Sequence, residues 1–553
     1  MMLKKNFNLY IKLLFFFYFI LGLLIYKDFG VGIEEHFHRQ NGFYWLIQIL
    51  SLFQIDNLSP FLGLAKEKYQ EILLSSTLPN INIFNFYGII FDVPFAFIET
   101  FFSIDSSKIF FEIRHLAIFV IFFISSIFFY KIINKRFKDK IFVITGLIFY
   151  VATPRIFGDS FHNNKDILFL SFLTISVYYL FSFFRKKKNK NLIIFCLFSA
   201  LASSSRIMGI YLPAIFLIFQ LVEYLSDKIS LKTYMSQLIK VLFFYIFFLY
   251  IHYPYMWELN ILELVSWFKN FFYWMDIKVL FNGEYYTIKY LPRSYLPIWI
   301  LITTPFFLII FTTISLYILS KRSFCRLIKI DEKSSLNSDF WSSCNEKNDF
   351  FILISFLSFI FFAIFLNVAM LSGWRHFYFL HFFLCYLSTL GFYHSYLFLR
   401  KKIKPNFIYI VPLLIFFNLS YSNYTFHPYQ SLYFNEFLSK EFVKKFQVDT
   451  ASISRSDALK FILSKENELK QIKVGNISWT PLRNGVDMLN EDDKIKFIFV
   501  GHEQKLADYI YTNFIYKSDE KFNNNYIISA NFKKIRDLKI NNVHIYSIYK
   551  KLK

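Results

Sequence analysis

The sequence predicts a mostly α-helical membrane protein, a polytopic transmembrane bundle of about eleven helices followed by a small α/β C-terminal extramembrane domain. Hydrophobic residues make up 56% of the 553 positions, and the mean hydropathy is +0.40, well above that of a soluble protein. Apolar runs of membrane-spanning length recur up to residue 420, and the chain then turns polar. This composition excludes disordered, collagen-like and disulfide-scaffold proteins.

Basic residues exceed acidic ones by 61 to 39, a formal net charge of +22. They occur in short clusters between apolar runs and not on one soluble face, so they indicate membrane topology. We therefore expect membrane lipids as partners and no nucleic acid.

The first apolar run extends from Tyr10 to Tyr26 and lacks a small-residue cleavage site, so it predicts an uncleaved transmembrane helix. Ten further spans are expected near residues 114–132, 141–154, 167–184, 191–205, 208–225, 238–252, 295–318, 351–371, 377–398 and 406–420. Together they define a transmembrane domain over residues 1–420 and leave residues 421–553 as a separate domain.

The basic clusters fall on alternate connections, as a consistent topology requires. The clusters are Lys4/Lys5, Lys131 to Lys140, Arg185 to Lys190, Lys321 to Lys329 and Arg400 to Lys404. We expect these clusters and the N-terminus to be cytoplasmic, in a bacterial inner (plasma) membrane. The loops 27–113, 154–166, 253–294 and 372–376, and everything after 421, then lie outside.

Two aromatic stretches of the first external loop, Phe43 to Phe53 and Phe84 to Phe102, are short and interrupted by Asp92, Pro94 and Glu99. They predict interfacial helices. In the C-terminal domain, short apolar runs at 496–500 and 543–548 predict strands, and Glu503 to Phe514 has a helical pattern.

Ionisable residues at a membrane edge are costly and therefore suggest function. Glu34 and Glu35 follow the first helix, together with two histidines and an arginine, and they suit a general base or a metal ligand. The alternative is a hydrated loop that caps the next helix. A second polar insert, residues 154–166, contains Asp159, His162, Lys165 and Asp166. Its alternative role is helix capping by Asn164 or Asp166.

Arginines form a third group. Arg206 ends the run Ala202-Ser-Ser-Ser-Arg206, and Arg375 and His376 precede a late span. A guanidinium matches phosphate oxygens and stays charged, although an arginine at a helix end can also extend toward lipid headgroups.

The order of these motifs resembles the C-type glycosyltransferase superfamily, in particular protein O-mannosyltransferases and the lipid A aminoarabinose transferase. The Glu34-Glu35 pair stands where those enzymes have Asp-Glu. Arg114 is similar to the arginine that opens their second helix, and Asp166 resembles their second-loop aspartate. Arg206 stands in place of a lysine in their Leu-Thr-Lys-Gly-Pro segment, and Arg375 resembles the arginine of their late Arg-Tyr-Leu-Leu-Pro motif.

This resemblance implies transfer of a sugar from a polyprenyl-phosphate donor to a glycan, lipid or protein acceptor on the outer face. It implies Glu34, Glu35 and Asp166 as catalytic residues, with either glutamate as the base. Substrate-binding residues would be Asp159, His162, Lys165, Arg206, Arg375 and His376.

Metal use is left open: a divalent ion fits the chemistry, but no tight ligand spacing is present, and the four cysteines form no Cys-x-x-Cys pair. Two other functions also remain open from the sequence. One is a transporter or flippase of a lipid-linked substrate, and the other is a noncatalytic scaffold.

Overall fold

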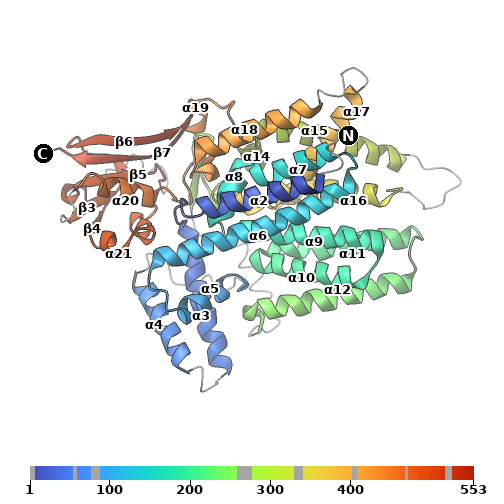
Figure 1. Ribbon diagram of the computed structural model, residues 1–553, viewed down its shortest axis with the longest axis horizontal. Coiled ribbons are helices and arrows are strands. Elements are labelled where there is room, and N and C mark those ends of the chain that lie inside the picture. Colours follow the sequence, from blue (N-terminus) through green and yellow to red (C-terminus); the bar gives the residue numbers. More distant parts are fainter. Residues whose placement is uncertain are drawn as a thin grey trace.

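Long apolar helices run side by side through most of the chain, and a small sheet lies at one end of them (Figure 1). The computed structural model describes residues 7–53, 59–75, 88–257, 277–328, 340–400, 408–466, 471–516 and 526–552. The bundle helices are α2 (Phe7–Ile25), α6 (Ser107–Arg136), α7 (Lys140–Ala152), α9 (Asp166–Lys186), α10 (Asn189–Ser205), α11 (Tyr211–Leu225), α12 (Leu231–His252), α14 (Tyr295–Thr303), α15 (Phe306–Ile328), α16 (Cys344–Phe365), α17 (Leu380–Leu399) and α18 (Ile410–Phe426).

A helix occurs at each of the eleven predicted places, and the predicted fold class is confirmed. Within the described ranges, eight helices are long and apolar enough to cross a membrane, or nine if one bent pair is a single span. The count is lower than predicted because α7 has 13 residues and α10 and α18 have only 17 each.

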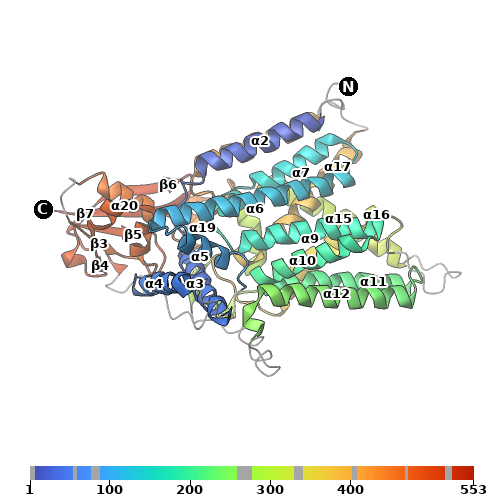
Figure 2. The ribbon, with the colours of Figure 1, turned by 60° about the horizontal axis from the view of Figure 1, so that its bottom comes forward.

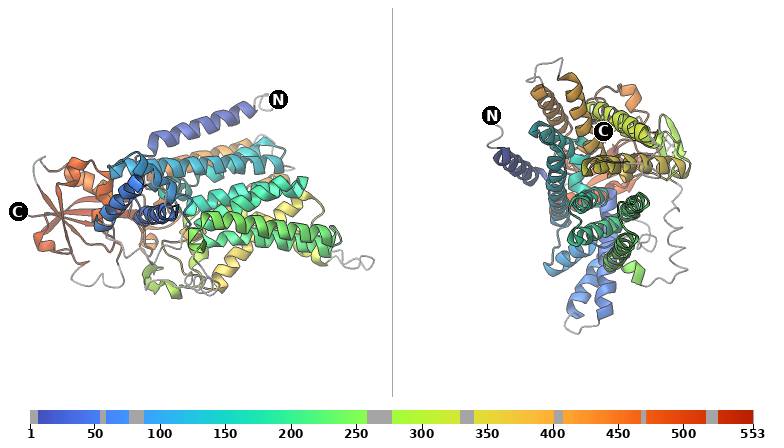
Figure 3. Two further views of the ribbon diagram at one scale, coloured as in Figure 1. Left: turned by 90° about the horizontal axis from the view of Figure 1, so that it is seen from below. Right: turned by 90° about the vertical axis from the view of Figure 1, so that its right-hand side faces the viewer.

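The bundle has an enclosed centre and a lipid-facing periphery. In α9, 89% of an apolar 18-residue stretch is buried inside the protein, whereas the corresponding stretches of α2 and α12 are each 17% buried. Figures 2 and 3 show α2 at the outer edge of the bundle. The exposed Leu and Phe side chains of α2 and α12 are those expected where a helix faces acyl chains.

Prolines introduce two breaks between helices that the sequence analysis did not predict. Pro154 begins α8 (Pro154–His162), which is bent by 53° from α7, because a residue before proline avoids helical angles. The expected loop 154–166 is therefore mostly a buried helix. Likewise, the predicted span 295–318 is divided into α14 and α15 just before Phe306, at Pro305.

Three helices lie beside the bundle near the sheet: α3 (Ile33–Phe53), α4 (Ser59–Ser75) and α5 (Asp92–Phe101) (Figure 1). Helices are present over Phe43–Phe53 and in the second half of the predicted stretch Phe84 to Phe102. The first part of that stretch falls among residues 76–87, outside the described residues. Whether α3 and α5 lie in the interface stays a prediction.

The C-terminal domain contains a five-stranded sheet in the order β4-β3-β5-β7-β6. Its strands are β3 (Ile472–Asn476), β4 (Phe497–Gly501), β5 (Tyr509–Thr512), β6 (Phe532–Ile540) and β7 (Val543–Lys551). β3 pairs in parallel with β4 and β5, and β7 is antiparallel to β5 and β6. Both strands predicted from apolar runs are confirmed as β4 and β7.

The predicted helix over Glu503 to Phe514 is wrong. This segment forms a short 3-10 turn, η10 (Gln504–Leu506), and then strand β5. All four β5 residues are buried, and the strand lies between β3 and β7. Aromatic and β-branched side chains favour such a central strand over a helix.

The segment that joins α18 to this domain is buried against the bundle. Its 3-10 turn η8 (Gln430–Leu432) packs on α8, where Gly158 leaves room for the backbone of Ser431. Arg155 donates from Nε to the carbonyl of Tyr433 at 2.7 Å. The connection is therefore part of the core.

Candidate functional site

Two carboxylates and two arginines from four separate segments form one chain of ion pairs at the end of the bundle nearest the sheet. Arg375 pairs with Glu34 at the start of α3 and, at 3.4 Å, with Asp166 at the start of α9. Arg206, at the end of α10, pairs with Asp166. We call these four residues the acid–arginine cluster. Residues that are far apart in the sequence are thus brought together by the fold.

Breaks in regular structure position the members of the cluster. Asn163 accepts the Asp166 backbone N–H at 2.9 Å and donates to the Asp166 carboxylate at 3.0 Å, so Asn163 caps α9. The capping residue is thus neither Asn164 nor Asp166. Arg206 lies in extended backbone between α10 and a 3-10 turn, η3 (Ile207–Ile210).

Arg375 begins another 3-10 turn, η6 (Arg375–Phe377), which follows Ser372 and Gly373 in left-handed conformations. A Cβ atom on Gly373 would lie 3.2 Å from the Trp299 ring, so a larger residue there would be crowded. This tight turn directs the Arg375 guanidinium back toward α3 and α9.

Glu34 is the member of the cluster most accessible to a ligand. Its side chain is 32% exposed, against 8% for Arg375 and 1% for Asp166. Burial alone would raise the pKa of Glu34, but the charges of Arg375, Lys165 and Arg206 lower it to about 2. Glu34 is therefore an anion at neutral pH.

Lys165 and His376 surround the cluster with further basic groups. Burial and the neighbouring Arg206 lower the pKa of Lys165 well below its usual range, although Glu34 and Asp166 act in the opposite direction. Burial, Arg206 and Arg375 also lower the pKa of His376 well below its usual range, so this imidazole is neutral. Both residues therefore lie beside the arginines, and their substrate-binding role stays a prediction.

Glu35 points to a different set of partners from Glu34. It is buried, accepts the Gly32 N–H at 2.8 Å, and lies 3.1 Å from His115 Nε2 on α6. Adjacent residues of a helix point in different directions, so the side chains of Glu34 and Glu35 lie in two different environments. Glu34 faces the arginines, and Glu35 binds the start of α3 to α6.

Asp159 and His162 lie on α8 at the border of the cluster. Both are buried, and His162 Nε2 is 3.8 Å from Asp159 Oδ1. Burial lowers the pKa of Arg375, but Glu34, Asp166 and Asp159 together raise it above its usual value. Asp159 is therefore one of three carboxyl groups near Arg375 that favour its charged form, after Glu34 and Asp166.

Asp92 is the residue that the sequence interpretation missed. The sequence marked it only as an interruption of an aromatic stretch, yet its buried carboxylate lies 2.9 Å from His38 Nδ1 and accepts from Arg114 at 2.9 Å. It also accepts from Asn41 and Asn164, each at 3.3 Å. One carboxylate thus connects α5 to α6, to α3, which carries Glu34, and to the loop that leads into Asp166.

The C-terminal domain contacts the backbone just before Glu34. Arg455, fully buried, donates to the carbonyls of Ser452, Pro481 and Val31. The Ile33 N–H donates to the Ala451 carbonyl at 3.0 Å. These bonds fix the first turn of α3 against the C-terminal domain.

The acidic residues do not form an obvious metal site. No group of three His, Cys, Asp or Glu side chains with suitable geometry occurs in the described part of the chain. Glu34 and Asp166 pair with arginines, and Glu35 with His115. The donor set therefore fits a metal poorly, and metal dependence stays an open prediction.

One family model matches part of the chain. Residues 93–252, from α5 to α12, match a family model described as dolichyl-phosphate-mannose-protein mannosyltransferase. The predicted resemblance to the C-type superfamily is confirmed for this segment, which contains Arg114, Asp166 and Arg206. No curated protein matches the chain.

The chain is also similar to the crystal structure of ArnT from Cupriavidus metallidurans bound to undecaprenyl phosphate. The identity is 8% and the TM-score 0.42, over 97% of each chain. A likeness this distant does not carry residue roles from one protein to the other.

Proposed function

We propose that this chain is a membrane glycosyltransferase that moves a sugar from a polyprenyl-phosphate donor to an acceptor on the outer face. The observation that carries the proposal is the acid–arginine cluster, which combines a partly exposed carboxylate with two guanidinium groups. The family match over residues 93–252 supports the same reaction class.

The cluster contains what such a transfer needs. An acceptor hydroxyl or amine attacks the anomeric carbon, the bond from that carbon to the phosphate oxygen breaks, and the acceptor proton passes to a carboxylate. The polyprenyl phosphate leaves as an anion, which guanidinium groups stabilise. Glu34 is the proposed base, and Arg206 and Arg375 hold the phosphate with help from Lys165.

Donor binding changes the basicity of Glu34 in this proposal. In the free protein, Arg375 pairs with Glu34 and contributes to its pKa of about 2. A donor phosphate that takes over Arg375 removes part of this stabilisation, so the Glu34 pKa rises toward the range of an effective base. Proton transfer is then coupled to the presence of the donor.

Glu35 and Asp166 have supporting roles in this scheme. Glu35 is buried and hydrogen-bonds His115, so it orients the first turn of α3 more readily than it reaches an acceptor. Asp166 holds Arg206 and Arg375 at one place. We propose that the C-terminal domain shields the site or binds an acceptor glycan, lipid or protein.

Incubation of the purified full-length chain with a labelled polyprenyl-phosphate sugar and candidate acceptors tests the proposal. We expect labelled acceptor in the wild type and none after removal of the donor. Movement of the label across a vesicle membrane without transfer would instead indicate a transporter or flippase. Binding with neither transfer nor movement would indicate a scaffold.

A further inference from the structure

The turn that carries Arg375 is bonded to the bundle through a tryptophan that the proposed mechanism does not use. Trp374 directly precedes Arg375, is buried, and donates from its indole Nε1 to Thr303 Oγ1 at 2.7 Å. Thr303 is the last residue of α14. This one hydrogen bond therefore joins a bundle helix to the residue beside the arginine of the acid–arginine cluster.

The hydroxyl of Thr303 is fixed by a second bond. It donates to the Trp299 carbonyl, one turn earlier in α14, at 2.6 Å. A hydroxyl has a single proton, so the remaining lone pairs of Thr303 Oγ1 are left to accept from Trp374. Because Thr303 is buried, bulk water does not compete for either bond.

The end of α14 is itself held in place. The Asn435 N–H donates to the Ile302 carbonyl at 2.8 Å, and the Asn435 side-chain amide donates to the Thr304 carbonyl at 3.2 Å. Carbonyl groups at a helix end lack partners within the helix, so these two bonds complete the end of α14. Asn435 belongs to the segment that joins α18 to the C-terminal domain, and Thr303 is therefore a fixed point for Trp374.

The backbone of the turn depends on such contacts. Ser372 has a φ of 62°, in the left-handed region, and it is followed by Gly373 at 69°. A serine in this region is unfavourable unless the surrounding structure holds it. The Trp374 bond on one side and the two carboxylate partners of Arg375 on the other thus determine where the guanidinium lies.

We propose that Trp374 is a positioning residue for Arg375, because its hydrogen bond to Thr303 keeps the guanidinium where the donor phosphate meets it. This inference rests on the proposed function. When the phosphate takes Arg375 over from Glu34, the turn loses one ion pair, and the bond between Trp374 and Thr303 is a contact that remains.

Three substitutions separate this bond from simple packing. Trp374→Phe keeps an aromatic ring but removes the N–H, and Thr303→Val removes the hydroxyl at nearly the same shape. Thr303→Ser retains the hydroxyl. Thr389→Val is the matched control, because Thr389 is also buried and donates to the carbonyl of Cys385, one turn earlier in its own helix, at 2.7 Å.

The first measurement is the affinity of the purified full-length chain for a polyprenyl-phosphate sugar. We expect a loss of roughly 10-fold in Trp374→Phe and in Thr303→Val, the cost of one buried group left unpaired. Thr303→Ser and Thr389→Val should stay close to wild type. In an Arg375→Gln background, Thr303→Val should cause no further loss, because residues that act through one another are not additive. The same loss in that background would overturn the proposal.

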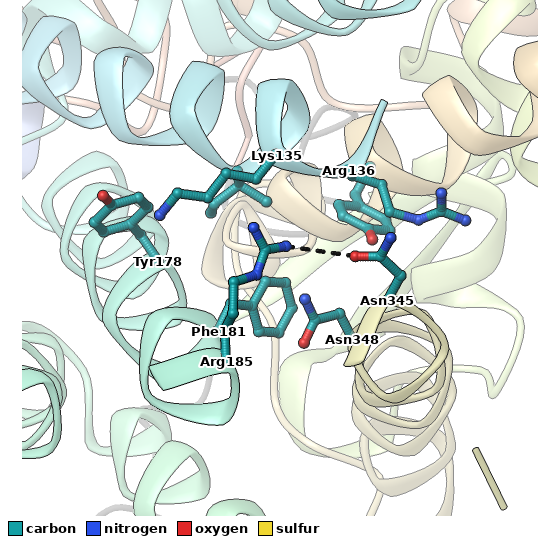
Figure 4. A pocket seen from close by; sticks show the side chains of 9 residues that line it. Lys135, Arg136, Tyr178, Phe181, Arg185, Asn345 and Asn348 are labelled. Atoms are coloured by element: carbon teal, nitrogen blue, oxygen red, sulfur yellow. Dashed lines mark hydrogen bonds between the residues drawn. The ribbon is translucent and has the colours of Figure 1, made fainter. Parts of the chain in front are cut away.

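The second measurement follows Arg375 without any donor. Phenylglyoxal modifies arginine side chains, and peptide mass spectrometry reports the rate at each one. Arg185, near the other end of α9 from Asp166, is the internal reference, because it is exposed and its bond to Asn345 is long, at 3.5 Å (Figure 4).

Relative to this reference, Arg375 should react in Trp374→Phe and Thr303→Val at roughly 10 times its wild-type rate, since the turn opens more often. Unchanged reaction of Arg375 in both variants would overturn the proposal. A wild-type chain that binds no donor would refute the proposed function, and the reaction rates would still decide whether Trp374 holds Arg375.

Discussion

Arg375 bridges two carboxylates, and its guanidinium is the group that we expect a donor phosphate to take over. Arg375→Gln should therefore weaken binding of a radiolabelled polyprenyl-phosphate donor by roughly 10- to 100-fold, the usual cost of a charge-assisted hydrogen bond. Arg293→Gln removes an exposed arginine from the loop before α14 and is the control. Similar affinities in the two variants would show that Arg375 does not contact the phosphate.

Arg114 is fully buried and donates to Asp92, so the negative charge of Asp92 balances a buried guanidinium. Asp92→Asn should lower the free energy of unfolding by about 3–5 kcal/mol, because it leaves a buried guanidinium without its counter-charge. Asp105→Asn, whose side chain is 91% exposed, should change it by less than about 0.5 kcal/mol. Equilibrium unfolding in mixed detergent measures both, and equal stabilities would contradict the bridging role of Asp92.

The sequence identified Asp166, Arg206 and Arg375 as candidate site residues, because a charged residue at the end of an apolar span is costly and therefore stands out in the sequence. It could not predict Asp92, whose partners His38 and Arg114 are distant in sequence and close only after folding. It also left open which glutamate faces the arginines, because that choice depends on where α3 begins.

At the level of elements, the start of α3 is fixed by its contact with the C-terminal domain. A Cβ atom on Gly30 would lie 2.0 Å from the Ile453 carbonyl oxygen, so Gly30→Ala must displace one backbone from the other. Because a shift of about 1 Å can cost ~100-fold in rate, we expect a large loss of sugar transfer and faster proteolysis of the C-terminal domain.

Gly63→Ala is the control for this substitution. Nothing lies within 4 Å of its Cβ position on α4, and alanine should stabilise that helix by about 0.5–1 kcal/mol. Wild-type transfer in Gly30→Ala would show that this contact does not position Glu34.

Element types were predicted well where apolar runs were long and poorly where they were short. The helix expected over 503–514 is strand β5, because sheet neighbours outweigh a weak local pattern. The bend between α7 and α8 was also not foreseen, although Pro154 was its visible cause.

For the whole molecule, the acid–arginine cluster and the C-terminal domain lie at one end of the bundle, and the described basic residues within 131–140, 185–190 and 321–326 lie at the other (Figure 1). We propose that the basic end and the N-terminus are cytoplasmic, in the bacterial inner membrane. Cys325 is exposed at the basic end, and Ser529 is exposed in the C-terminal domain.

In sealed right-side-out vesicles, a membrane-impermeant maleimide should label the Ser529→Cys variant at its new thiol and leave Cys325 unlabelled until the vesicles are opened. Inverted vesicles are the control and should give the opposite pattern. Labelling of Cys325 in sealed right-side-out vesicles would reverse the proposed orientation.

Turnover of the Glu34→Gln variant tests most directly the claim that the acid–arginine cluster is the site of sugar transfer. With donor and acceptor saturating, we expect a rate at least ~100-fold below wild type, the usual contribution of a general base, with the protein still folded. Glu491→Gln, at an exposed carboxylate of the C-terminal domain, should keep the wild-type rate. Near-wild-type turnover in Glu34→Gln would contradict the account.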